Sequence, residues 1–155
     1  KTQQRTWKNT TAWAEGYLLS VLKQSAQAQE LRLAVEALFD RDEKAQIVLT
    51  GDFNATGETG TLRLLRADPD DTASPDWAHR RLFQLDASLP LPDRQTVIHR
   101  GKGQALDHIL ASGTMTDRVV DVRVFNAGLP DEVFEADDET YAGSYHAAMR
   151  AQFDI

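Results

Sequence analysis

Apolar residues recur at three- and four-residue spacing in the second quarter of the chain. They are Ala28, Leu31, Ala34, Val35, Leu38 and Phe39. Polar residues separate them, so the pattern predicts an amphipathic helix from Ser25 to about Phe39. Residues 12–22 are also apolar, but Gly16 weakens a helix prediction there. Residues 1–11 are polar and predict a loop, with Trp7 as the only large anchor.

Short apolar runs of strand length fill much of the remaining chain. They lie at residues 46–50, 96–99, 104–111, 118–125 and 146–153. The Arg-Gly-Lys-Gly segment at 100–103 predicts a hairpin turn. Residues 59–66 predict a short helix capped by Thr59. Helices and strands together indicate an α/β (α+β) fold, and no internal repeat is visible.

Two polar segments interrupt these elements. Residues 67–92 are rich in proline and aspartate and predict a long surface excursion, with one strand or helical turn near 81–85. Asp68, Asp70 and Asp71 lack the glycine and the distal glutamate of a calcium loop, which favours a solvated loop. Trp77 is expected to fill a loop core rather than to stack on a base. Residues 131–139 form a second acidic loop.

Length, composition and charge limit the function classes. A chain of 155 residues with 41% hydrophobic content predicts one domain with a core. The net charge of -7 argues against a pure nucleic-acid-binding module, and an anionic substrate requires local cations or a bound metal. The absence of cysteine excludes disulfides and thiolate chemistry but leaves the compartment open. The apolar stretches are far shorter than the roughly 20 residues of a membrane span, so no transmembrane segment is expected.

Asp52 and Asn54 stand two positions apart, directly after the predicted strand at 46–50. Residues with this spacing on a strand share a face, so a carboxylate and an amide are offered at one point. Such a pair suits a metal ion and a phosphate. The alternative is that Asp52 opens a turn and Asn54 caps the following segment, as these residue types often do. The motif alone leaves both interpretations open.

Three motifs follow one another in the chain. They are GDFN at 51–54, LDHIL at 106–110 and GSYH at 143–146. Their order and contexts resemble the endonuclease/exonuclease/phosphatase family, metal-dependent phosphoesterases that include deoxyribonuclease-type and abasic-site nucleases. The resemblance covers residue 25 to the end, which corresponds to the C-terminal half of such a domain. It implies half of a four-layer αββα sandwich, with a mixed β-sheet and flanking helices.

Phosphodiester cleavage requires charge neutralisation at the phosphoryl oxygens, an activated water and a stabilised leaving group. The resemblance implies that Asp52 binds Mg²⁺ or Mn²⁺ or orients water, and that Asn54 donates to a phosphate oxygen. It implies that His146 is the general base, held in its useful tautomer by Asp107. The structural alternatives are an ordinary strand-edge acid at Asp107 and a surface histidine at His146.

Other charged or aromatic residues receive weaker assignments. Arg100 and Lys102, in the predicted turn, are candidates for substrate phosphate contacts, although a basic hairpin tip is commonly only solvated. His108 alternates to the opposite face from Asp107, which favours a structural role. His79 and His99 are expected to have no functional role.

Two departures from the family pattern bear on activity. Tyr145 stands where the family has an aspartate, so a metal ligand from that position would be a phenol, a poorer magnesium ligand. The family's upstream metal-binding glutamate, asparagine and catalytic histidine have no counterpart before Ser25. Residues 1–155 are therefore expected to be the C-terminal part of one domain, completed by an upstream half or by a second chain that covers its apolar faces.

The sequence thus predicts a metal-dependent phosphoester hydrolase, foremost a nuclease-like phosphodiesterase, with nucleic acid as one candidate among phosphodiester substrates. A phosphatase or phospholipase acting on inositol phosphates or sphingolipid headgroups is the enzymatic alternative, because the same core serves both substrate classes. A degenerate, non-catalytic binding domain is the alternative that Tyr145 suggests.

Overall fold

The computed structural model describes residues 7–135 and 143–155, and its first element is one long helix, α1 (Thr10–Phe39). The Asn9 side chain caps it by accepting a hydrogen bond from the Ala12 backbone N–H (2.9 Å). Gly16 does not interrupt it, since a single glycine costs only about 1 kcal/mol in a helix. The Trp7 ring packs directly over Gly16, where a Cβ atom would lie 2.1 Å from it. Trp7 is thus an anchor, as expected, and the loop prediction for residues 10 and 11 is wrong.

The buried face of α1 differs from the predicted stripe. Ala28, Arg32, Val35 and Phe39 are buried, whereas Leu31 and Leu38 are 38% and 44% exposed. Arg32 fits into the interface because its guanidinium donates to the carbonyls of Leu65 (3.0 Å) and Arg80 (2.8 Å) and pairs with Glu36. A buried, fully hydrogen-bonded arginine therefore occupies a position that an apolar pattern does not predict.

A three-stranded antiparallel sheet occupies the centre of the protein. Its strands are β1 (Val48–Asp52), β5 (Asp107–Ser112) and β2 (Leu82–Gln84), in the order β1-β5-β2. Two antiparallel hairpins accompany it, β3 (Val97–His99) with β4 (Lys102–Gln104) and β6 (Val119–Phe125) with β7 (Ala148–Phe153). Among the described residues, parallel pairing is limited to an isolated bridge between Ile98 and Asp131. The mixed helix and strand content confirms the α+β class.

The β3–β4 hairpin turns within the predicted segment 100–103, but at its first two residues only, because Lys102 and Gly103 belong to β4. Arg100 and Gly101 have φ angles of 52° and 74°, and positive values at both positions are those of a two-residue type I′ turn. The single strand expected at residues 104–111 is instead divided into β4 and β5. The chain leaves the hairpin after Gln104 and enters the central sheet at Asp107, so the two strands belong to different sheets.

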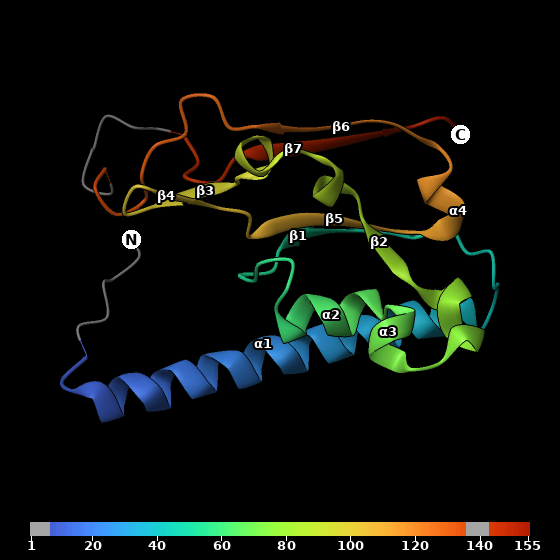
Figure 1. Ribbon diagram of the computed structural model, residues 1–155, viewed down its shortest axis with the longest axis horizontal. Helices are drawn as coiled ribbons and strands as arrows, with labels where there is room; N and C mark the ends of the chain where they lie inside the picture. Colours follow the sequence, from blue (N-terminus) through green and yellow to red (C-terminus); the bar gives the residue numbers. More distant parts are fainter. Residues whose placement is uncertain (1–6, 136–142) are drawn as a thin grey trace.

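The central sheet is covered on both faces. Figure 1 shows α1, α2 (Gly60–Arg66) and α3 (Pro69–Thr72) on one side and the β6–β7 hairpin on the other. Leu110 and Leu82 pack toward the helices with Phe39, whereas Ile109 and Ala111 pack toward β6 and β7. Because neighbouring residues of β5 point to opposite faces, this single strand contributes to both hydrophobic clusters.

The excursion at residues 67–92 is built of short helical turns around β2. They are α3, η1 (Pro75–Arg80), η2 (Leu85–Ser88) and the start of η3 (Leu91–Arg94). Trp77 is 56% exposed, so the prediction of a loop core is wrong. Its ring lines a surface cavity beside α1 instead. Asp68 pairs with Arg66 and Arg81, and Asp71 pairs with Arg63. These acids therefore have protein counter-ions.

The remaining elements close the chain. α4 (Gly113–Thr116) connects β5 to β6, and Thr59 is the N-cap residue of α2. The Thr59 hydroxyl donates to the Thr56 carbonyl rather than accepting a helix N–H, so the predicted side-chain cap is not formed.

The later part of the acidic loop predicted at 131–139 lies outside the described residues. No helix in the described ranges is long and apolar enough to cross a bilayer.

Candidate active site

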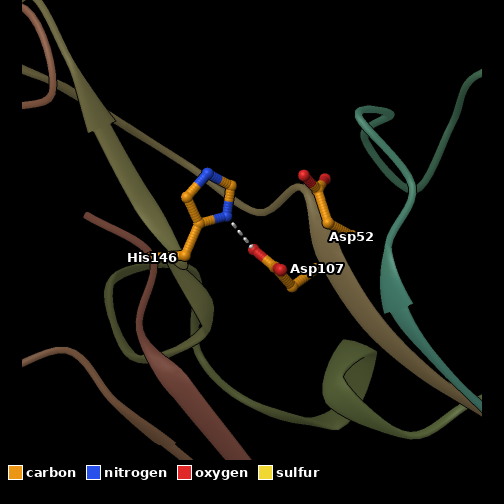
Figure 2. A group of neighbouring side chains, drawn as sticks. All are labelled: Asp52, Asp107 and His146. Atoms are coloured by element: carbon orange, nitrogen blue, oxygen red, sulfur yellow. Dashed lines mark hydrogen bonds and ion pairs between the residues drawn. The ribbon is translucent and has the colours of Figure 1, made fainter. Parts of the chain in front are cut away.

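Three chemically active side chains meet where β1 ends and β5 begins. The antiparallel register places Asp52 directly opposite Asp107. His146 reaches the same point from the segment just before β7. Figure 2 shows the three side chains directed toward one another. One ligand atom from each lies within 4.8 Å of the others, and this is the cluster of metal-binding type found among the described residues.

Asp107 and His146 form a hydrogen-bonded pair. Asp107 Oδ2 lies 2.8 Å from His146 Nδ1, and both side chains are partly buried. Burial alone lowers the pKa of His146, but the Asp107 hydrogen bond and charge, with the charges of Asp52 and Glu132, outweigh it and raise the pKa above 6.5. Because Nδ1 of His146 is engaged by Asp107, its Nε2 is the ring nitrogen without a hydrogen-bond partner in the described part of the chain.

Thr96 connects the two halves of this pair. Its buried hydroxyl accepts the backbone N–H groups of Leu106 (3.0 Å) and Asp107 (3.1 Å). Its carbonyl accepts the N–H of Ala147 (2.8 Å), the residue after His146. One residue thereby sets the position of Asp107 relative to His146. The sequence offered no signal for this role, since Thr96 resembles any other residue of a short strand.

Asp52 and Asn54 do lie together, although the geometry differs from the prediction. Asn54 follows β1 and has a φ of 48°, so it is not on the strand. Its backbone N–H and its side-chain amide donate to Asp52 Oδ1 (2.8 Å) and Oδ2 (3.2 Å). This is the turn that the alternative interpretation described, and it still brings carboxylate and amide to one exposed point. The argument from strand spacing is wrong, because the strand ends at Asp52.

The other candidate residues lie on the β3–β4 hairpin and on the segment before β7. Arg100 and Lys102 are exposed at the tip of the β3–β4 hairpin. The Tyr145 hydroxyl donates to the Glu135 carbonyl (2.7 Å), which attaches the phenol to the loop after Leu129. Ser144 Oγ accepts the His146 N–H (3.1 Å) and so forms a tight turn just before the site.

Asp131 holds the tip of the β3–β4 hairpin by accepting a hydrogen bond from the Gly101 backbone N–H. Burial alone would raise its pKa, but the backbone N–H groups of Gly101, Phe134, Val133 and Arg100 outweigh this effect and lower the pKa to about 2. Glu132 lies 2.6 Å from His99 Nδ1 on the same hairpin. These contacts fix the turn that carries Arg100.

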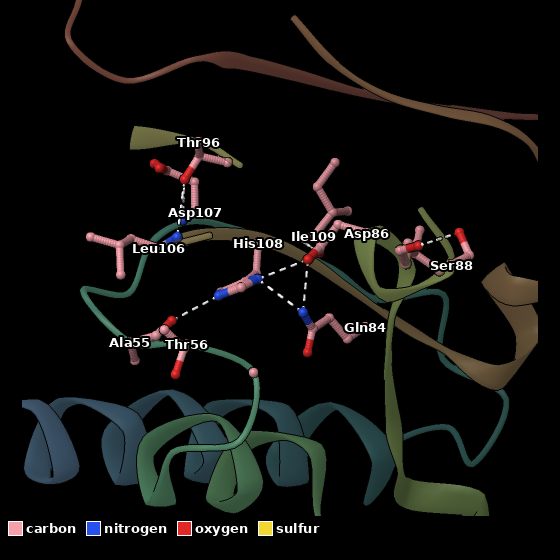
Figure 3. A network of polar contacts seen from close by, with 12 residues as sticks. Ala55, Thr56, Gln84, Asp86, Ser88, Thr96, Leu106, Asp107, His108 and Ile109 are labelled. Carbon is pink, nitrogen blue, oxygen red and sulfur yellow. Dashed lines mark hydrogen bonds and ion pairs between the residues drawn. The ribbon is translucent and has the colours of Figure 1, made fainter. Parts of the chain in front are cut away.

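His108 is fully buried on the opposite face of β5, which confirms its structural role. Its Nδ1 contacts Asp86 Oδ2 (2.9 Å) and its Nε2 contacts the Ala55 carbonyl (2.8 Å), as Figure 3 shows. Burial tends to raise the pKa of Asp86, but hydrogen bonds from His108, Gln84 and the Ile109 N–H lower it overall. The network joins the turn after Asp52 to β2 and β5.

The donor set fits a hard divalent cation. Carboxylate oxygens are the ligands that Mg²⁺ and Mn²⁺ prefer, and an imidazole nitrogen is compatible with Mn²⁺. Asp52 is exposed and Asp107 and His146 are partly buried, so an ion held here would be accessible to solvent and substrate.

The protein thus has an antiparallel sheet under a helical layer, with two carboxylates and a histidine at its strand ends. A family model described as the endonuclease/exonuclease/phosphatase family matches residues 10–146, and the chain belongs to this family. Its members are hydrolytic enzymes that typically use a divalent metal. Searches of curated proteins and of solved structures find no significant match.

Proposed function

We propose that the protein is a divalent-metal-dependent phosphodiesterase of nuclease type. The observation that supports this most directly is the convergence of Asp52, Asp107 and His146 within 4.8 Å at the strand ends of a family member. Asp52 holds Mg²⁺ or Mn²⁺, and Asn54 donates the second hydrogen of its amide to a phosphate oxygen.

A bound divalent ion supplies Lewis acidity toward the phosphoryl oxygens. His146 accepts the proton of the attacking water through Nε2, since Nδ1 is occupied by Asp107. The Asp107 carboxylate fixes the tautomer and stabilises the imidazolium that forms. Arg100 and Lys102 approach the substrate from the hairpin tip and contribute positive charge, which a chain of net charge -7 requires locally.

We further propose that this chain is the C-terminal part of a larger domain. Large apolar side chains are exposed along the first half of α1 and on β6, namely Trp13, Tyr17, Leu18, Leu19, Leu22, Val120 and Phe125. Exposed apolar surface of this kind favours a covering segment. The mass of the natively expressed protein tests this: at least about 10 kDa beyond 17.3 kDa supports an upstream half, and 17.3 kDa contradicts it.

The activity is tested with bis(p-nitrophenyl) phosphate in the presence of Mg²⁺. Asp52→Ala should abolish metal-dependent turnover, whereas Asp154→Ala, an exposed aspartate near the C-terminus, should leave it unchanged. Turnover retained in Asp52→Ala would contradict the role of Asp52. Equal loss in both variants would contradict a specific site.

A non-catalytic binding domain is the second candidate, because Tyr145 replaces the family's aspartate and its hydroxyl is engaged by Glu135. Tyr145→Asp distinguishes the two candidates. If the site is intact but weakened, this variant should hydrolyse the diester faster than the parent. If neither protein hydrolyses it with Mg²⁺ or Mn²⁺, the binding-domain candidate is favoured.

A further inference from the structure

A cavity of about 420 Å³ is lined by His108, on the opposite face of β5 from Asp107, and by segments that adjoin the candidate active site in the chain. Its lining includes Thr56 and Gly57, which follow the Asp52–Asn54 turn, and Gln104 and Ala105, which precede Asp107. The walls are therefore continuous in the chain with both segments that carry the site. We name it the Arg94 cavity, after the arginine in its lining, and a volume of this size suits one small substrate group.

The walls of the Arg94 cavity are fixed by hydrogen bonds. Asn126 Nδ2 donates to the carbonyls of Pro92 (2.9 Å) and Gln95 (3.1 Å), which holds the segment that carries Arg94. On the other wall, Arg66 donates to the Gly57 carbonyl (2.8 Å). The cavity is thus preformed, so ligand binding has little ordering entropy to overcome.

The charges of the lining favour an anion. Arg66 pairs with Asp68, whose Oδ2 lies 3.0 Å from the Arg66 Nε and which also pairs with Arg81. Arg94 is half-buried and has no hydrogen bond or ion pair with the described residues. A half-buried guanidinium without a counter-ion binds an anionic oxygen group strongly, because the contact is charge-assisted. Glu58 is the carboxylate in the lining, but it is exposed and hydrated.

Glutamine side chains supply neutral donors and acceptors in the same cavity. Gln95 lies so close to Gly103 that a Cβ atom there would be 2.0 Å from Gln95 Oε1, so the glycine makes room for this amide. Gln104 and Gln84 also contribute to the lining. One free cation surrounded by amides suits an oxygen-rich anion attached to a polar group, such as a phosphorylated sugar.

We propose that the Arg94 cavity binds a second phosphate group of the substrate, next to the scissile phosphodiester, and that Arg94 provides its charge. This inference rests on the proposed phosphodiesterase function and names the substrate feature that the site selects. The same chemistry is offered by the next phosphate of a nucleotide chain and by a ring phosphate of a phosphorylated inositol.

The test compares diesters with and without a second phosphate. One arm uses a thymidine dinucleotide with and without a terminal phosphate, and the other uses glycerophosphoinositol with and without a ring phosphate. The wild-type protein should prefer the phosphorylated member of one pair by about tenfold in kcat/KM, the effect of one charge-assisted contact. Which pair shows the preference identifies the source of the phosphate.

Matched variants assign this preference to the cavity. Arg94→Gln should remove it. Arg118→Gln, a half-buried arginine outside the cavity lining, should keep it. Glu58→Gln should strengthen it, because a negative charge leaves the rim. A preference that survives in Arg94→Gln, or equal rates for both members of both pairs, would overturn the proposal.

A binding measurement separates this inference from the proposed function. Isothermal titration calorimetry with thymidine 5′-phosphate and inositol monophosphate, without metal, reports on the cavity independently of turnover. Weaker binding of either probe to Arg94→Gln than to Arg118→Gln supports the phosphate site even if no diester is hydrolysed. Equal binding to both variants overturns it even if the diesterase activity is present.

Discussion

Replacing Thr96 by valine tests how the Asp107–His146 pair is held. Valine preserves the shape of threonine but removes the hydroxyl, which accepts the N–H groups of Leu106 and Asp107. An unsatisfied buried donor costs about 1–3 kcal/mol, and these two contacts are partly buried, so we expect a loss of about 2 kcal/mol in the free energy of unfolding. Thr96→Ser keeps the hydroxyl and loses one methyl group, for which about 1 kcal/mol is expected.

Stability alone does not distinguish a positioning role from a structural one, so the assay must report on the pair itself. The pKa of His146 is raised by Asp107 against the opposing effect of burial. Thr96→Val lets Asp107 move, so the pKa of His146 should fall toward 6.5 or below, and kcat should fall about 10- to 100-fold, as expected for a misplacement near 1 Å. NMR titration of the His146 ring and the pH profile of kcat measure these effects.

Thr96→Ser is the control for these measurements. It should retain the raised pKa of His146 and most of kcat, with a stability loss of about 1 kcal/mol by urea denaturation. If Thr96→Val keeps both the parent's His146 pKa and its kcat while losing stability, Thr96 is only a structural residue and the reasoning is refuted.

Three further predictions concern single groups. Asp107→Asn should lower the pKa of His146, because its largest raising cause disappears while burial remains, and the acid limb of the pH–rate profile should move to lower pH; an unmoved NMR titration would contradict this. The raised pKa of protonated His146 stabilises the fold below about pH 6.5, and this stabilisation disappears as the pH rises through the folded-state pKa. Asp107→Asn should therefore cost more stability at pH 6 than at pH 9 in urea titrations. Leu110→Ala, at a fully buried position, should cost about 3 kcal/mol, whereas Leu91→Ala, 67% exposed, should cost under about 0.5 kcal/mol, and similar values for both would contradict the assigned core.

The sequence predicted those elements whose determining residues lie within a few positions of one another. The positive-φ turn at Arg100 and Gly101 and the strand before Asp52 follow from residue types within a few positions. The continuous helix through Gly16 could not be predicted, because the ring that covers this glycine comes from Trp7, outside the periodic segment. The exposure of Trp77 likewise depends on how the excursion folds against α1.

The candidate site likewise contains residues that the sequence identified and residues that only the structure identified. Asp107 and His146 were identified from motifs, and the structure brings them within 2.8 Å. Thr96 and Asp86 were missed, because their roles arise from contacts with segments 10 or more residues away. Arg94 became a candidate only when the cavity around it was visible. Long-range hydrogen bonds leave no periodic trace in the sequence, so such residues require a structure.

The central claim, that Asp52 holds the divalent metal of a phosphodiesterase next to the Asp107–His146 pair, is tested most directly by titrating Mn²⁺ into isotope-labelled protein and recording paramagnetic broadening by NMR. The account predicts that the signals of these three residues and of Asn54 broaden first, and that Asp52→Ala removes the effect. Broadening that begins at Asp68–Asp71, with the signals of Asp52 and His146 unchanged, would contradict it.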